Sequence, residues 1–177
     1  MVKNVWVALV LLMSGATSAY AGFYAGPLLS FESLSVNGAS YQGFMPRLML
    51  GYGGFVREAF FLGAEMEAGT TSIPINNHPN SYAGLKTSYS YGISLVPGLA
   101  LDEYLMGYVR LGVLFSHFSS ANLNATHSGF QRGLGLETKF AENWSVRGEV
   151  DYVSYASFAN VGSPAAFQYV LGLNYWF

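Results

Sequence analysis

The chain of 177 residues contains no cysteine, which excludes a disulfide framework and a cysteine-ligated metal site. Charge is also scarce, because Asp, Glu, Lys and Arg make up 10% of the residues, whereas a soluble domain carries about a quarter. The formal net charge of −2 offers no basic surface for nucleic acid, so we expect no nucleic-acid partner. After residue 21, no apolar run approaches the roughly 20 residues that a transmembrane helix needs.

The first 21 residues form a segment of their own. MVKN carries one positive charge, VWVALVLLM is an apolar run, and SGATSAYA ends in the small-x-small triplet Ala19-Tyr20-Ala21. This order is typical of a secretory signal peptide. We therefore predict a signal peptide over residues 1–21 and a mature chain over residues 22–177. No cysteine follows the cleavage site, so lipoprotein anchoring is not expected.

The mature chain is rich in aromatic residues, at 16% of the whole sequence, and it repeatedly alternates apolar with small or polar residues. A period of two predicts β-strands. Most of the predicted segments have the roughly 9–11 residues that a tilted membrane-spanning strand needs. The eight predicted strands are Gly22–Glu32, Gln42–Tyr52, Phe60–Gly69, Leu85–Leu99, Leu105–Ser116, Ser128–Phe140, Ser145–Tyr155 and Ala166–Phe177.

The connecting segments alternate in length. GGFVREA, ALDEY and AENW are short, whereas SLSVNGASY, TTSIPINNHPNSYAG, HFSSANLNATH and ASFANVGSP are longer and rich in Ser, Asn, Gly and Pro. Short turns on one side and longer loops on the other are the pattern of bacterial outer-membrane proteins. We expect the short turns, and both ends of the mature chain, to lie in the periplasm.

Nearly all charged residues within the predicted strands fall on one face, with Arg132 as an exception on the lipid-facing side. In Ser145–Tyr155, for example, Val146, Val150 and Tyr152 alternate with Arg147, Glu149 and Asp151. A soluble β-sandwich would also bury one apolar face, but the signal peptide, the aromatic strand ends and the apolar last strand favour a membrane. Because a bilayer cannot satisfy open strand edges, the sheet must close. The prediction is an all-β fold, an eight-stranded antiparallel up-and-down transmembrane β-barrel.

The interior of such a barrel is just wide enough for side chains to fill it. Charges buried there must be paired, so we predict that salt bridges plug the lumen. With Lys86 included, five cationic and five anionic residues are expected to balance. The predicted ion-pair cluster consists of Arg47, Glu65, Glu67, Arg110, Glu137, Lys139, Arg147, Glu149 and Asp151.

Two stretches resemble a known family. GFYAGPLLSF is similar to the first strand, and YVLGLNYWF to the C-terminal assembly signal, of the small outer-membrane barrels that include the OmpA transmembrane domain, OmpX and Opa-like surface proteins. The resemblance implies a location in the outer membrane of a Gram-negative cell. It also implies contact with lipid, lipopolysaccharide and the barrel-assembly machinery. The assembly signal would comprise Tyr169, Leu171, Leu173, Tyr175 and Phe177.

Members of that family are structural proteins or adhesins, so we expect a non-enzymatic surface antigen whose loops contact host molecules. A small porin or an OmpW-like channel is the alternative. The stretch His117-Phe118-Ser119 also resembles the motif of PagL-type lipid A deacylases, with His117 as base and Ser119 as nucleophile, but Gln131 stands where the acid should be. The histidines lack metal-ligand spacing, and neither a cofactor nor a metal is expected.

Overall fold

The fold is described from a computed structural model that covers residues 21–36, 39–70, 73–77, 86–120, 123–157 and 163–177. The predicted signal peptide lies almost wholly outside the described residues. Among the described residues, no helix is long and apolar enough to cross a membrane. The described chain consists of strands joined by turns and loops.

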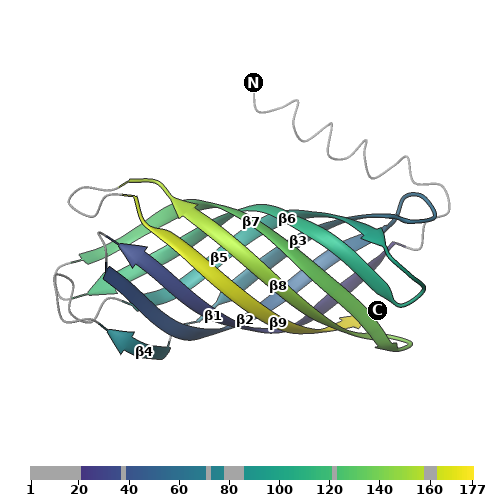
Figure 1. The fold of residues 1–177 in the computed structure, drawn as a ribbon, viewed down its shortest axis with the longest axis horizontal. Coiled ribbons are helices and arrows are strands. Elements are labelled where there is room, and N and C mark those ends of the chain that lie inside the picture. The colour runs from purple at the N-terminus through teal and green to yellow at the C-terminus, as the bar shows by residue number, and fades with distance from the viewer. Residues whose placement is uncertain (1–20, 37–38, 71–72, 78–85, 121–122, 158–162) are drawn as a thin grey trace, which may run out of the picture.

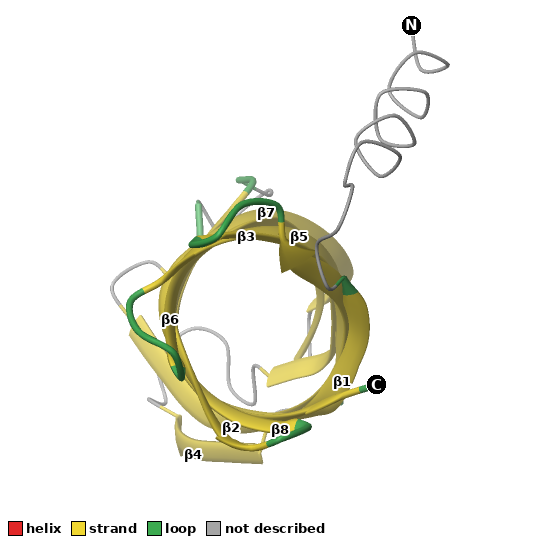
Figure 2. Ribbon diagram, turned by 90° about the vertical axis from the view of Figure 1, so that its right-hand side faces the viewer, coloured by secondary structure: helices red, strands yellow, loops and turns green. Residues whose placement is uncertain are grey.

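Eight long antiparallel strands form a closed barrel, as predicted. Each strand pairs with two neighbours in the ring order β1-β9-β8-β7-β6-β5-β3-β2, and the pairing of β1 with β2 closes the ring (Figures 1 and 2). A ninth strand, β4, lies outside the ring. The bounds are β1 Gly22–Val36, β2 Ala39–Phe55, β3 Phe60–Gly69, β4 Ile73–Asn77, β5 Lys86–Ala100, β6 Leu105–Ser120, β7 Leu123–Ala141, β8 Trp144–Tyr155 and β9 Ala165–Trp176.

The loop end of the barrel contains more strand than the sequence predicts. The β1–β2 ladder continues to the pair Val36–Ala39, and the β6–β7 ladder to the pair Ser120–Leu123. Strand β4 pairs only with β2, beyond the barrel wall (Figure 1). The prediction of long loops at 33–41 and 117–127 is therefore wrong. Pairing satisfies the backbone hydrogen bonds of these polar segments whether or not lipid surrounds them.

The opposite end carries short turns, as predicted, at 56–59, 101–104 and 142–143. The side chain of Asp102 stabilises the second of them, because its Oδ1 accepts the backbone N–H groups of Tyr104 and Leu105 at 2.7 and 2.8 Å. The C-terminus lies at this same end (Figure 1).

Side chains alternate between the outside and the inside of the barrel. On β9, Leu171 is 66% exposed, whereas its neighbours Val170 and Gly172 are buried. On the strands, most of the exposed side chains are apolar and most of the charged ones are buried inside, which confirms the predicted sorting of the strand faces. This is the reverse of a soluble protein, and it suits a barrel whose outer wall contacts lipid.

Two prolines interrupt the ladders without shifting them. Pro27 and Pro97 each interrupt one ladder, but the pairs on either side keep the same register. A bulge occurs between Thr87 and Tyr89. It changes the alternation of β5, and as a result Lys86 is exposed rather than in the lumen.

Candidate functional site in the barrel lumen

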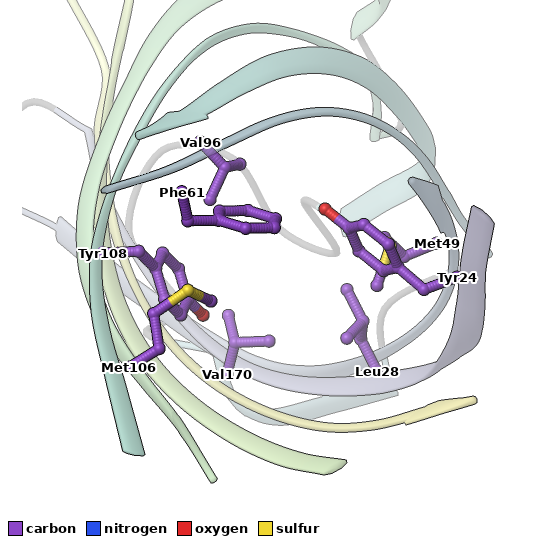
Figure 3. Close-up of a cluster of buried hydrophobic side chains, with 8 residues drawn as sticks. All are labelled: Tyr24, Leu28, Met49, Phe61, Val96, Met106, Tyr108 and Val170. Atoms are coloured by element: carbon purple, nitrogen blue, oxygen red, sulfur yellow. The ribbon is translucent and has the colours of Figure 1, made fainter. Parts of the chain in front are cut away.

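Two clusters of apolar side chains lie inside the barrel, one towards each end. The cluster at the turn end projects inward from the surrounding strands (Figure 3). It consists of Tyr24, Leu28, Met49, Phe61, Val96, Met106, Tyr108 and Val170. The cluster at the loop end consists of Leu34, Tyr41, Leu114, Phe118, Val153, Tyr155 and Ala166.

Glu65 is the centre of the charged network. Its carboxylate accepts hydrogen bonds from Arg110 Nη2 and from Arg147 Nη1, the latter at 2.9 Å to Oε1. The hydroxyl of Tyr24 donates to the same Oε1 at 2.7 Å. Strands β3 and β8, which carry Glu65 and Arg147, are four places apart in the ring in either direction, so this pair joins opposite walls of the barrel.

The two arginines are held by further acids. Arg147 Nη2 lies 2.7 Å from Glu137 Oε2, and Arg110 Nε lies 2.8 Å from Glu149 Oε1. Tyr108 donates its hydroxyl to Glu149 Oε2 at 2.8 Å. The network thus pairs Arg110 and Arg147 with two acids each, as buried charges require, and among the described residues Nη1 of Arg110 has no hydrogen-bond partner.

A second polar group lies further towards the loop end. Arg47 Nη1 is 3.3 Å from Glu67 Oε1. Two carboxylates in this region are held by amides instead of cations. They are hydrogen-bonded at 2.8 Å in the pairs Gln131–Asp151 and Gln168–Glu32.

Eight of the nine residues of the predicted ion-pair cluster are buried in the lumen. Lys139 is the exception. It is exposed at the turn end, where its Nζ lies 5.7 Å from the centre of the Trp176 ring, and none of the ion pairs among the described residues includes it. Its position on the last inward-facing site of β7 explains the difference, because the lumen ends there.

The predicted balance of charge is wrong. With Lys86 and Lys139 exposed, the lumen buries three arginines, and it buries six carboxylates because Glu32 joins the predicted five. Sequence reasoning overlooked Glu32 as a lumen residue, although it shares its parity on β1 with the buried Tyr24 and Ser30. The polar partners Gln131 and Gln168 were also not predicted as part of the site.

His117 and Ser119 of the deacylase-like motif lie on the outer face near the loop end, whereas Phe118 and Gln131 are buried in the lumen. His117 stacks on Tyr89 at 4.7 Å, and its Nδ1 and Nε2 lie 2.9 Å from Thr126 Oγ1 and 2.7 Å from Asn124 Oδ1. The Ser119 hydroxyl lies 2.7 Å from that of Ser88. Among the described residues, no carboxylate is hydrogen-bonded to the imidazole, and no group of three or more His, Cys, Asp or Glu side chains is arranged to hold a metal.

The predicted assembly signal lies along the outer face of β9, in direct reach of lipid. Its terminal Phe177 is 76% exposed, and the backbone N–H of Phe177 donates to Phe23 O at 2.9 Å. Aromatic pairs surround the turn end of the barrel here, including Trp144–Tyr175 and Phe23–Tyr52. Such rings are typical of the membrane interface.

Comparisons with known proteins agree with this architecture. The family model described as outer membrane protein beta-barrel domain matches residues 5–177. Neisserial surface protein A is 18% identical with a TM-score of 0.66, and the match covers 91% of this chain and 100% of that one. Ail, the attachment invasion locus protein of Yersinia pestis, solved with the heparin analogue sucrose octasulfate, is 12% identical with a TM-score of 0.58 and the same coverage. No curated protein matches the sequence.

Proposed function

Because the chain belongs to the outer membrane protein beta-barrel domain family, and is thus an outer-membrane protein, we propose that it is a non-enzymatic surface barrel with a closed lumen. Its extracellular end would contact neighbouring or host molecules. The molecule would contribute to envelope structure through the barrel and to attachment through the strand extensions at the loop end.

The observation that carries the closed lumen is the contact between Glu65 and Arg147. These residues come from opposite walls, so their side chains meet across the full width of the interior. Apolar clusters lie towards both ends of the lumen. An eight-stranded barrel has little interior space beyond its side chains, so these groups leave no wide channel.

The loop end supports an attachment role by its rigidity. The β1–β2 and β6–β7 hairpins and strand β4 present paired backbone beyond the barrel wall, so a partner would meet ordered strands. Binding to a rigid surface costs less conformational entropy than binding to a flexible loop. Ail, which shares the fold, is an attachment and invasion protein by name, and this supports the same role here.

Recording across a planar bilayer tests the closed lumen. We expect no stable conductance steps from the wild-type protein. Arg147→Ala, which removes the side chain that crosses the lumen, is expected to produce brief openings and serves as the control for insertion. Reproducible steps from the wild type would instead favour a small porin or an OmpW-like channel.

Cell binding tests the attachment role. Bacteria that lack the gene should bind host epithelial cells several-fold less well than the parent strain. A version whose β6–β7 hairpin is shortened to a tight turn near the pair Ser116–His127 should share the defect while remaining in the outer membrane. A matched exchange of the periplasmic turn 101–104 should bind normally. Equal binding by all strains would contradict the proposal.

A further inference from the structure

A shallow apolar groove crosses the outer wall of the barrel near the turn end. It extends from the start of β3 over β5, β6 and β7 to β8, and its volume is about 700 Å³. That volume lies within the range of roughly 300–1,000 Å³ that is usual for small-molecule sites. The side chains that point outward along it are apolar, such as Leu99, Leu136 and Val150. The groove is therefore suited to a hydrocarbon chain.

Two glycines create the space in this groove. Gly107 on β6 and Gly148 on β8 are both cross-strand partners of Leu136 on β7. A Cβ atom at Gly148 would meet only Leu171 Cδ2 at 3.9 Å, and one at Gly107 would come no closer than 3.5 Å to Leu101 Cδ1. Side chains would fit at both positions, so a larger residue there would fill the groove without displacing the wall.

The groove adjoins a second hollow at the turn between β2 and β3. Phe60 and Leu99 line both, and the second hollow, of about 450 Å³, is also lined by Arg57 and Glu58. These two charged residues are exposed, and neither forms an ion pair with another described residue. The apolar groove thus ends beside one positive and one negative side chain.

We propose that this site binds one phospholipid with a phosphoethanolamine headgroup. An acyl chain lies in the groove across Gly107 and Gly148, and Arg57 binds the phosphate, because a guanidinium matches phosphate oxygens in charge and geometry. The carboxylate of Glu58 accepts hydrogen bonds from the primary ammonium. A choline headgroup has no N–H to donate to Glu58, and a glycerol headgroup has no positive charge to pair with it. This site is independent of the attachment role proposed above.

Native mass spectrometry of the detergent-folded protein tests the site. We expect the wild type to retain one phosphatidylethanolamine, and to retain phosphatidylcholine and phosphatidylglycerol with the same acyl chains several-fold less. Gly148→Leu, which fills the groove, should reduce all three lipids to the same low level. Gly107→Leu should behave in the same way, which protects the test against a folding defect in either variant.

The two charged residues are tested separately, because each is assigned to a different part of the headgroup. Arg57→Gln should retain about fivefold less phosphatidylethanolamine than the wild type. Glu58→Gln should retain more phosphatidylglycerol than the wild type, because it removes the negative charge that disfavours this lipid.

Matched controls separate the site from general effects on the barrel. Ala64→Leu adds similar bulk to an outward position of β3 that does not line the groove, and Lys139→Gln removes another exposed cation at the turn end. Both should bind phosphatidylethanolamine like the wild type, and the heat-induced change in gel migration shows whether each variant is folded.

Three results would overturn the proposal. The first is equal retention of the three lipids by the wild type. The second is full retention of phosphatidylethanolamine by the folded groove-filling variants or by Arg57→Gln. The third is a wild-type dimer that Gly148→Leu dissociates, because the groove would then hold a second copy of the chain.

Discussion

Nη1 of Arg147 lies 2.9 Å from Oε1 of Glu65, although the two residues are 82 positions apart and belong to opposite walls of the barrel. Neither side chain is more than 1% exposed in this pair. A contact of this kind connects strands that share no backbone hydrogen bond, so it stabilises the cross-section of the barrel directly.

Replacing Glu65 is therefore expected to be severe. Glu65→Ala leaves Arg110 and Arg147 each short of one partner in a buried site, and breaking a buried pair in this way costs about 3–5 kcal/mol. Guanidinium unfolding in detergent micelles measures the change. Glu58→Ala, in an exposed turn, should change the free energy of unfolding by less than about 0.5 kcal/mol. A similar small effect from Glu65→Ala would contradict the network described here.

Replacement by alanine should have different effects at Gly135, on the inner face of the barrel wall, and at Gly148, on the outer face. A Cβ at Gly135 would overlap the Tyr108 ring inside the lumen, so we expect Gly135→Ala to destabilise the barrel by about 1–3 kcal/mol. At Gly148, on the outer face, the nearest atom would be Leu171 Cδ2 at 3.9 Å, and Gly148→Ala should be almost neutral. Thermal unfolding of both variants measures this difference. Equal effects would contradict the placement of Gly135 on the inner face and Gly148 on the outer face of the barrel.

Arg132 is the charged residue that faces outward from the wall of β7. Its guanidinium lies 4.9 Å from the centre of the Tyr152 ring. Near an anionic membrane surface a basic residue contributes about 1 kcal/mol. We expect Arg132→Gln to lower stability by about that amount in vesicles that contain lipopolysaccharide or anionic lipid at low salt. In zwitterionic vesicles the loss should be much smaller, and a loss independent of lipid charge would show that packing on Tyr152 is the cause.

The exposed Phe177 is expected to act in assembly more than in stability. It contributes little buried area, since 76% of it is exposed. We predict that Phe177→Ala reduces the amount of folded protein in cells several-fold while leaving refolding of the purified chain in detergent unchanged. Phe140→Ala, another exposed aromatic residue at the turn end, is the control. If both variants lose the same amount of folded protein in cells, Phe177 acts only as one of the interfacial aromatic residues at the turn end and not as an assembly signal.

Strand alternation made most of the barrel predictable. In β8 and β9 the period of two, with no interruption, assigned each side chain to the correct face. The prediction failed where a bulge or the end of the lumen intervened, as at Lys86 and Lys139. It also failed at the loop end, because polar residues such as Asn124 and Thr126 suit a solvated loop and a paired strand equally well.

The sequence by itself determined that alternate residues form a lipid-facing and a polar surface, and hence that the sheet must close, because a period of two is a local property of the chain. Only the tertiary structure decided which charges meet. Glu65 reaches Arg147 across the lumen, while Glu32 and Asp151 are left to the amides Gln168 and Gln131. Those contacts depend on strand register and on the width of the closed ring, and both arise only when all eight strands are paired.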